Sequence, residues 1–147
     1  MSTSIAQAAV NALYAGDRAS QMLGIEVLGI EPGCVRVAMT VRPDMANGHG
    51  ICHGGLLFAL ADSAFAFACN SHGVAMVAAG ASIEFLAPTR VGERVIATAR
   101  QISRTERHGI YDVVIAAAGG ETIAHFRGRC ARLRVHTQKA TLGEQRR

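Results

Sequence analysis

The hydrophobic residues of this chain alternate with polar ones along several short segments. The clearest alternation covers residues 35–42, where every second side chain is apolar and its neighbours are polar or small. The apolar positions are Val35, Val37, Met39 and Val41. Such a period of two predicts a strand with one buried face. Because a Glu31-Pro32-Gly33 turn precedes it, residues 24–43 are predicted to form two strands.

Four further strand-like segments follow in the second half of the chain, at residues 74–86, 93–104, 109–118 and 121–135. Turn-forming sequences separate them, namely Pro88, RTERHG and the Gly119-Gly120 pair. Strands joined by such short turns are predicted to form a meander, in which each strand pairs with the next.

Between the two groups of strands, residues 54–69 are predicted to form a helix whose only polar side chains are Asp62 and Ser63. A helix that is apolar all round must be enclosed on nearly every side. In a chain of 147 residues, the available cover is its own antiparallel sheet. We therefore predict an α+β protein with the hotdog fold, a long antiparallel sheet wrapped around a central apolar helix. Residues 1–147 form one domain in this interpretation, with a frayed polar tail from about residue 137.

The N-terminal segment is predicted to be a helix and not a signal peptide. Ser4 and Gln7 have the spacing of a capping box, Gly16 stands where a helix would stop, and no basic residue precedes the apolar stretch. The apolar run at 54–69 is too short to span a bilayer comfortably and contains Asp62. The four cysteines are scattered without a CxxC pair. We therefore expect a cytoplasmic protein with reduced thiols and no membrane contact.

The formal net charge of +4 indicates an anionic partner. Nucleic acid is a poor candidate, because aromatic residues make up 5% of the chain and no dense Lys/Arg tract is present. A small phosphorylated ligand such as coenzyme A fits this charge better. Four arginines lie on the predicted last strand, at Arg127, Arg129, Arg132 and Arg134. We interpret two of the four as the solvated face of an edge strand protected against aggregation.

The segment NGHGICHGGLLFALAD, residues 47–62, contains more glycines than a chain reversal requires. Gly54 and Gly55 begin the apolar helix, where the first N–H groups have no partner within the helix. Helped by the helix dipole, these groups can hold an anion or a developing oxyanion. Glycine also has no side chain to keep a substrate carbonyl away. Close packing at the start of a crowded helix would require the same glycines, so both interpretations stay open.

Asp62 favours the functional interpretation. A carboxylate in an apolar helix costs free energy unless it is paired or used, and no basic residue lies between Arg42 and Arg90. The functional hypothesis makes Asp62 a nucleophile or a general base beside an oxyanion hole, which suits acyl transfer. The structural alternative is an acid satisfied by a distant arginine or by backbone donors.

Two other motifs in the same loop are weak. The sequence GHGICH at 48–53 resembles a phosphate-binding GxGxxG loop, but it has His53 in place of the third glycine and no parallel strand before it. His49, Cys52 and His53 could ligate a metal, but glycines interrupt the segment and no HExxH glutamate is present. We therefore predict no metal site. Cys52 and His53 are adjacent and seldom could face each other as a nucleophile pair, so Cys52 is interpreted as a small buried side chain.

Residues 47–71, with the pattern NGHxxCHGGxxFxLADxAFAFACNS, resemble the hotdog acyl-CoA thioesterases, and closely the phenylacetate-degradation (PaaI-type) group. The similarity continues through IEFLAP at 83–88, GIYDVVI at 109–115 and FRG at 126–128. The resemblance implies hydrolysis of an acyl-CoA thioester, with an aryl-acetyl group such as phenylacetyl or hydroxyphenylacetyl favoured. It also implies a dimer or tetramer of hotdog subunits that uses neither a metal nor another cofactor.

The same resemblance assigns roles by position. Asp62 would be the catalytic carboxylate, and the Gly54 N–H would polarise the thioester carbonyl. His53 would position the loop, and Asn47 would hold the attacking water or the carbonyl.

Gly55 and His49 complete the predicted site as substrate-binding residues. Other branches of the family carry a hydroxyl side chain near the acid; one helical turn after it this chain has Ala66, which leaves the anhydride and direct water routes open. A hotdog enoyl-CoA hydratase or dehydratase is one alternative, but it would need a histidine paired with the acid, and the next one is His72. A non-catalytic acyl-CoA-binding or regulatory module is the other alternative, in which Asp62 would be structural only.

Asp62 and Gly54 cannot serve one site from a single helix. They are eight positions apart, which separates them by roughly 12 Å along the axis and by about 80° in direction. A nucleophile must lie within about 3.5 Å of the carbonyl carbon. Two antiparallel helices related by a twofold axis could bring the acid of one chain to the glycine of the other. We therefore predict a homodimer, or a dimer of dimers, with its sites between chains.

Overall fold

The structure is a computed structural model that describes residues 3–134. Two helices, α1 (Thr3–Gly16) and α2 (Arg18–Met22), precede six strands and a central helix, α3 (Gly54–Asn70). A short 3-10 helix, η1 (Pro43–Met45), leads into the loop before α3. The strands are β1 (Glu26–Glu31), β2 (Cys34–Thr40), β3 (Met76–Phe85), β4 (Arg94–Arg104), β5 (His108–Ala117) and β6 (Thr122–Arg132).

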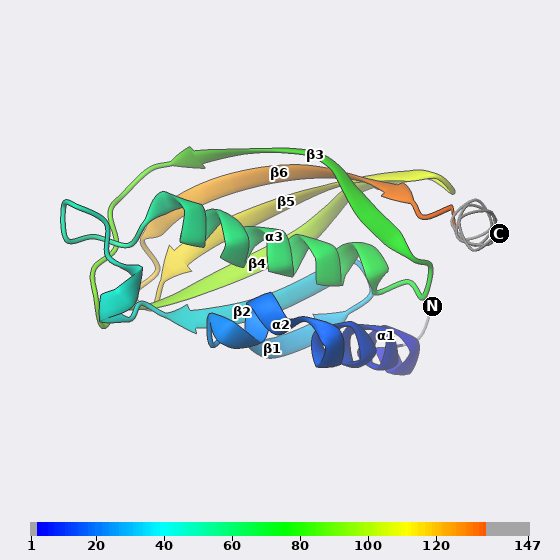
Figure 1. Cartoon of the computed structure of the whole chain (residues 1–147). Helices are drawn as coiled ribbons and strands as arrows, with labels where there is room; N and C mark the ends of the chain where they lie inside the picture. The colour runs from blue at the N-terminus through cyan, green and yellow to red at the C-terminus, as the bar shows by residue number, and fades with distance from the viewer. Residues whose placement is uncertain (1–2, 135–147) are drawn as a thin grey trace, which may run out of the picture.

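All six strands form one antiparallel sheet in the order β1-β2-β4-β5-β6-β3. The sheet curves around α3, and α1 and α2 lie beside β1 at the lower edge of the view (Figure 1). This arrangement is the hotdog fold, as the apolar character of residues 54–69 predicted. The predicted polar tail from about residue 137 lies outside the described residues.

The predicted meander is only partly correct. Strands β4, β5 and β6 pair in sequence order, but β3 pairs with β6 and β2 pairs with β4. The reason is the path of α3, which carries the chain from the β2 side of the sheet to its far edge (Figure 1). Consequently β6 is an inner strand, and the interpretation of its arginines as an edge-strand face is wrong. Arg127 instead binds Asp112 of the neighbouring strand β5, with Nε to Oδ1 at 2.6 Å.

Helix α3 forms the centre of the core because its apolar side chains fill the concave face of the sheet. Phe65 is 1% exposed and packs against Tyr111 and Phe126, with ring centroids 6.0 and 5.6 Å away. A Cβ at Gly128 of β6 would lie 2.8 Å from the Phe65 ring. Glycine at 128 is therefore what allows this aromatic ring to approach the sheet.

The N-terminal helices close one side of α3. The ring of Tyr14 packs edge-on against Phe67, and its hydroxyl donates a hydrogen bond to the Ile25 carbonyl at 2.7 Å. Helix α1 ends at Gly16 as predicted and begins at Thr3, one residue before the predicted cap at Ser4. Among residues 3–134, no helix is both long enough and apolar enough to cross a membrane. The four cysteines are free thiols.

Candidate active site

The N-terminus of α3 is capped by a histidine. His53 has φ −59° and ψ 130°, just outside the helical region, and its Nδ1 accepts a hydrogen bond from the Gly55 N–H at 3.0 Å. Its own N–H donates to the Met45 carbonyl at 2.8 Å, which ties the cap to η1. Because Nδ1 accepts, it carries no proton in this arrangement. His53 thus caps the start of α3, and its role in positioning a catalytic loop, which the family resemblance implied, stays a prediction.

The cap leaves one amide available at the helix start. The Gly55 N–H is committed to His53, whereas the Gly54 N–H donates no hydrogen bond within residues 3–134. This free donor lies at the positive end of the helix dipole. The Phe85 ring covers the glycine, since a Cβ at position 54 would lie 3.0 Å from its Cζ atom. Gly54 therefore offers an unpaired N–H beneath an aromatic ring.

Asn47 organises the loop that precedes the cap. Its Oδ1 accepts hydrogen bonds from the N–H groups of His49 and Ile51, at 2.9 and 3.3 Å. Its backbone N–H donates to the Ile51 carbonyl at 2.7 Å, and Gly50 completes the turn with φ +76°. These bonds fix which end of the amide faces the loop, and they leave its Nδ2 as a donor. The His49 side chain is exposed to solvent.

Two clefts border α3, and they divide the predicted site residues between them. The loop cleft, of about 390 Å³, is lined by Asn47, Gly54 and Phe85 among others. The acid cleft, of about 500 Å³, is lined by Asp62 together with residues of α1, the rest of α3 and β3. Within one chain, Asp62 and Gly54 therefore do not meet. This division agrees with the separation expected from their eight-residue spacing.

Asp62 lies half-buried in the acid cleft, and none of the described residues is its cationic partner. Burial raises the pKa of its carboxyl above the ordinary value, and the negative charge of Asp17 raises it further. Within residues 3–134, no hydrogen bond or ion pair reaches its carboxylate. The structural alternative, an acid satisfied by a distant arginine or by backbone donors, is therefore not observed there. A desolvated carboxylate without a partner is a stronger base than an exposed one.

Two residues that sequence reasoning missed also belong to these clefts. Asp17 follows α1 and lines the acid cleft with Asp62. Phe85, at the end of β3, lines the loop cleft over Gly54. The Gly16-Asp17 pair carried a local signal, because an acid directly after a helix stop is a preferred cap for a new helix. Phe85 carried no such signal, since only the tertiary fold brings it to the glycine.

Cys52 has the environment of a packing residue. Its side chain is buried, its thiol donates to the His53 carbonyl at 3.7 Å, and burial raises the pKa of the thiol. A thiol whose pKa is raised supplies little of the nucleophilic thiolate. Its interpretation as a small buried side chain is confirmed. In the described part of the chain, no three His, Cys, Asp or Glu side chains cluster in a way that could hold a metal.

Comparison with known proteins identifies the family of this chain. The Thioesterase superfamily matches residues 49–124. The acyl-coenzyme A thioesterase PaaI of Escherichia coli (strain K12) is 43% identical over 123 residues, which are 84% of this chain and 88% of that protein. The solved structure of the E. coli PaaI protein from the phenylacetic acid degradation operon superposes with a TM-score of 0.88 and 41% identity, covering 89% of this chain and 95% of that one.

A second solved structure, a mutant of the phenylacetic acid degradation protein PaaI from Thermus thermophilus, has a TM-score of 0.77. It is 39% identical and covers 80% of this chain and 100% of that one. Both the histidine cap of α3 and the helix with Asp62 fall inside the matched family region. The chain therefore belongs to the thioesterase superfamily, among its PaaI-type acyl-CoA thioesterases.

Proposed function

We propose that this protein hydrolyses the thioester of a small aryl-acetyl coenzyme A, such as phenylacetyl-CoA or hydroxyphenylacetyl-CoA, to the free acid and coenzyme A. The observation that carries the proposal is Asp62, an unpaired carboxylate in a largely apolar cleft. Leu13, Ala66 and Val77 line the same cleft and offer an apolar surface for the acyl group. The names of the relatives, which refer to phenylacetic acid degradation, support the choice of an aryl-acetyl group.

In the proposed reaction the Gly54 N–H donates a hydrogen bond to the thioester carbonyl oxygen, and this bond strengthens as the oxygen becomes negative. On the general-base route, Asp62 takes a proton from water while the resulting hydroxide attacks the carbonyl carbon. On the nucleophilic route, Asp62 attacks directly and forms a mixed anhydride, which water then hydrolyses. In both cases the C–S bond breaks, and the sulfur leaves as a thiolate that takes up a proton. The Asn47 Nδ2 would hold the water or the carbonyl, and Gly55 and His49 would bind substrate.

We place each reaction site between two chains. Strand β3 is an edge of the sheet, and most of its side chains are exposed, including Val77 at 46% and Phe85 at 53%. An exposed apolar edge is suited to pairing with another strand. The start of β3 (residues 76–78) borders the acid cleft, and its end at Phe85 borders the loop cleft.

This placement at opposite ends of β3 supports a twofold dimer. If two β3 strands pair antiparallel, the start of one lies beside the end of the other. The acid cleft of one chain then faces the loop cleft of its partner. Asp62 would thus act on a carbonyl held by Gly54 of the partner subunit. Two such dimers could associate further into a homotetramer.

A coenzyme A ester panel tests the proposal. We expect thiol release from phenylacetyl-CoA and hydroxyphenylacetyl-CoA to exceed release from acetyl-CoA and palmitoyl-CoA. The Asp62→Asn variant should lose at least about 100-fold in turnover, because a general base contributes at least that much. If this variant folds and retains more than about a tenth of wild-type turnover, the role of Asp62 is wrong. No thiol release from any ester would favour the acyl-CoA-binding module.

The same panel addresses hydration. A hydratase would need a histidine beside Asp62, and the described residues that line the acid cleft include none. We therefore expect no loss of enoyl absorbance when crotonyl-CoA is the substrate. The proposed reaction also uses no metal or other cofactor, so dialysis against a strong chelator should leave the rate unchanged. A loss that zinc or another divalent ion restores would contradict the metal-free route.

A further inference from the structure

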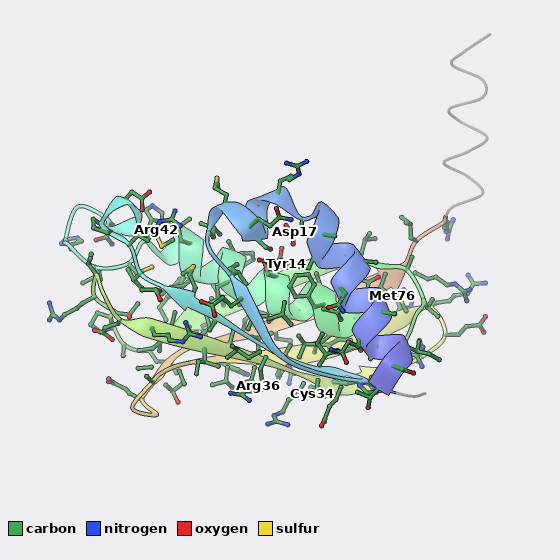
Figure 2. All side chains as sticks on the ribbon, turned by 90° about the horizontal axis from the view of Figure 1, so that it is seen from below. Tyr14, Asp17, Cys34, Arg36, Arg42 and Met76 are labelled. Atoms are coloured by element: carbon green, nitrogen blue, oxygen red, sulfur yellow. The ribbon has the colours of Figure 1, made fainter. Side chains whose placement is uncertain are left out.

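A second carboxylate, Asp17, is fixed at the rim of the acid cleft. It lies at the bend where α1 ends and α2 begins (Figure 2). Its Oδ1 accepts the Ser20 N–H at 2.9 Å, and its Oδ2 accepts the Ser20 hydroxyl at 2.6 Å. The first bond is an ordinary N-cap of α2. With one hydrogen bond on each oxygen, the Asp17 carboxylate is held in a single orientation.

A hydrogen-bond chain connects Asp17 to the helix that carries Asp62. The Oγ atoms of Ser20 and Ser63 are 2.7 Å apart, and Ser63 follows Asp62 directly on α3. Because the Ser20 hydroxyl proton goes to Asp17, the Ser63 hydroxyl must donate to Ser20. Ser20 is 1% exposed, so its hydroxyl is shielded from water, whereas Asp17 and Ser63 are half-buried. The bend between α1 and α2 is thus attached to α3 at the residue next to the catalytic acid.

Within residues 3–134 of one chain, the other residues that line the acid cleft contribute no positive charge at Asp62. Asp17 and Asp62 are the charged residues that line the cleft, and Cys69 of α3 is the other titratable one. Cys130 of β6 lies against Cys69, and the residues that β3 contributes are uncharged. The field at Asp62 therefore comes chiefly from Asp17. Burial raises the pKa of Asp62, and this like charge acts in the same direction.

We propose that Asp17 is a positioning residue that acts as a fixed negative charge and makes Asp62 a stronger base or nucleophile. This inference rests on the proposed function, in which Asp62 attacks or activates water. A neighbouring anion disfavours ionisation of Asp62, so a higher pH is needed to form its carboxylate. Once formed, that carboxylate is more basic, and a more basic catalyst gives a faster proton transfer. Asp17 thus lowers the activity at acid pH and raises the rate at neutral pH.

The Asp17→Asn variant tests this charge without removing the helix cap, because Asn caps helices as well as Asp does. We expect the acid limb of the kcat/KM profile for phenylacetyl-CoA to move to lower pH and the plateau rate to fall. A purely structural role would lower the plateau without moving the limb. Asp17→Ser is a second uncharged cap residue and should give the same displacement. Glu121→Gln removes an exposed acid outside the cleft and should leave both quantities unchanged.

A measurement without substrate separates this inference from the proposed function. Carbon-13 NMR of the labelled aspartate carboxyls follows the titration of Asp62, identified by its loss in Asp62→Asn. In Asp17→Asn the Asp62 titration should move to lower pH, together with the acid limb. An unmoved titration would overturn the inference even if Asp62 is catalytic. A titration that moves while the acid limb stays fixed would overturn the role of Asp17 in catalysis. The proposed function fails on different outcomes, namely retained activity of Asp62→Asn or no thiol release from any ester.

Discussion

His53 and Gly55 form a closed pair at the start of α3, in which the Nδ1 of the histidine accepts the N–H of the glycine at 3.0 Å. This bond decides which amide of the HGG sequence is available for chemistry. Because Gly55 is committed, the donor left without a partner in the described part of the chain is the N–H of Gly54. Two adjacent glycines that look equivalent in the sequence therefore differ in the structure: Gly55 serves the cap, and Gly54 is free to bind a carbonyl oxygen.

The Gly54→Pro substitution should abolish activity without unfolding the helix. Proline suits the first helical position, and the ψ of 130° at His53 suits the residue before a proline. The change removes the free N–H, and loss of one oxyanion donor typically costs about 10²–10³ in kcat. Gly54→Ala is the matched control, because it adds the same Cβ beside the Phe85 ring but keeps the N–H. Steady-state kinetics that show equal losses in both variants would assign the effect to Phe85 and not to the amide.

Substitutions of His53 measure how much its cap of α3 contributes to the free energy of unfolding. His53→Ala should lower the free energy of unfolding by about 0.5–2 kcal/mol, the usual cost of losing an N-cap. His53→Asn should recover most of that stability, since Asn is a preferred cap. Thermal and urea unfolding of the two variants measure the difference. If the alanine variant is as stable as wild type, the Nδ1 bond does not hold the helix start.

The pH dependence of stability reports the burial of Asp62. Burial raises the pKa of the Asp62 carboxyl in the folded chain, so protonation of this carboxyl at low pH stabilises the fold. This stabilisation is lost as the pH rises through the pKa of the carboxyl in the folded chain. The Tm of Asp62→Asn should therefore match that of wild type in acid and exceed it at neutral pH.

Asp112→Asn provides a control of opposite sign. The Arg127 guanidinium beside it lowers the pKa of the Asp112 carboxyl. The ionised Asp112 carboxylate stabilises the fold at pH values above the pKa that this carboxyl has in the unfolded chain. The stabilisation is lost as the pH falls through its lower pKa in the folded chain. Asp112→Asn should therefore be less stable than wild type at neutral pH and equal to it in strong acid. Parallel pH profiles for the two variants would mean that Asp62 is not desolvated in the assembled protein.

The local pattern predicted those parts of the fold that depend on nearby residues. Helix α3 was expected over residues 54–69 and extends over Gly54–Asn70, because two glycines and a long apolar run mark its limits. Helix α2, of five residues, is too short to show a helical period and was not predicted. The pairing of β3 with β6 was also not predicted. This pairing depends on the edge of the sheet at which the chain emerges from α3, and no local hydrophobic period indicates that edge.

The candidate site shows the same limit. Asp62 and Gly54 were chosen from the sequence as candidate site residues because an acid in an apolar helix and a glycine pair at its start are unusual in themselves, and their roles stay predictions. The sequence around Asp17 indicates a helix cap but not its place at the acid cleft, and Phe85 reaches the loop cleft only through tertiary contacts. The choice between Gly54 and Gly55 as donor likewise depended on the direction of the His53 side chain.

The sharing of each site between two chains can be tested by subunit mixing. Asp62 and Gly54 border different clefts of one chain, and eight helical positions separate them by roughly 12 Å along the axis. We therefore expect Asp62→Ala and Gly54→Pro to be inactive as separate proteins and to complement each other when mixed. Each mixed dimer would contain one site in which both groups are intact and one in which both are damaged.

Random exchange of equal amounts makes about half of the dimers mixed, so about a quarter of wild-type activity should return. The control is a mixture of Asp62→Ala with Asp62→Asn, which cannot assemble an intact site and should stay inactive. Exchange itself is followed by mass spectrometry of subunits that carry different isotope labels. If the first mixture exchanges, remains folded and stays inactive, both groups act within one chain. The site would then require a conformational change that brings Asp62 to Gly54 of the same chain, and the proposed pairing of two β3 strands would not explain the activity.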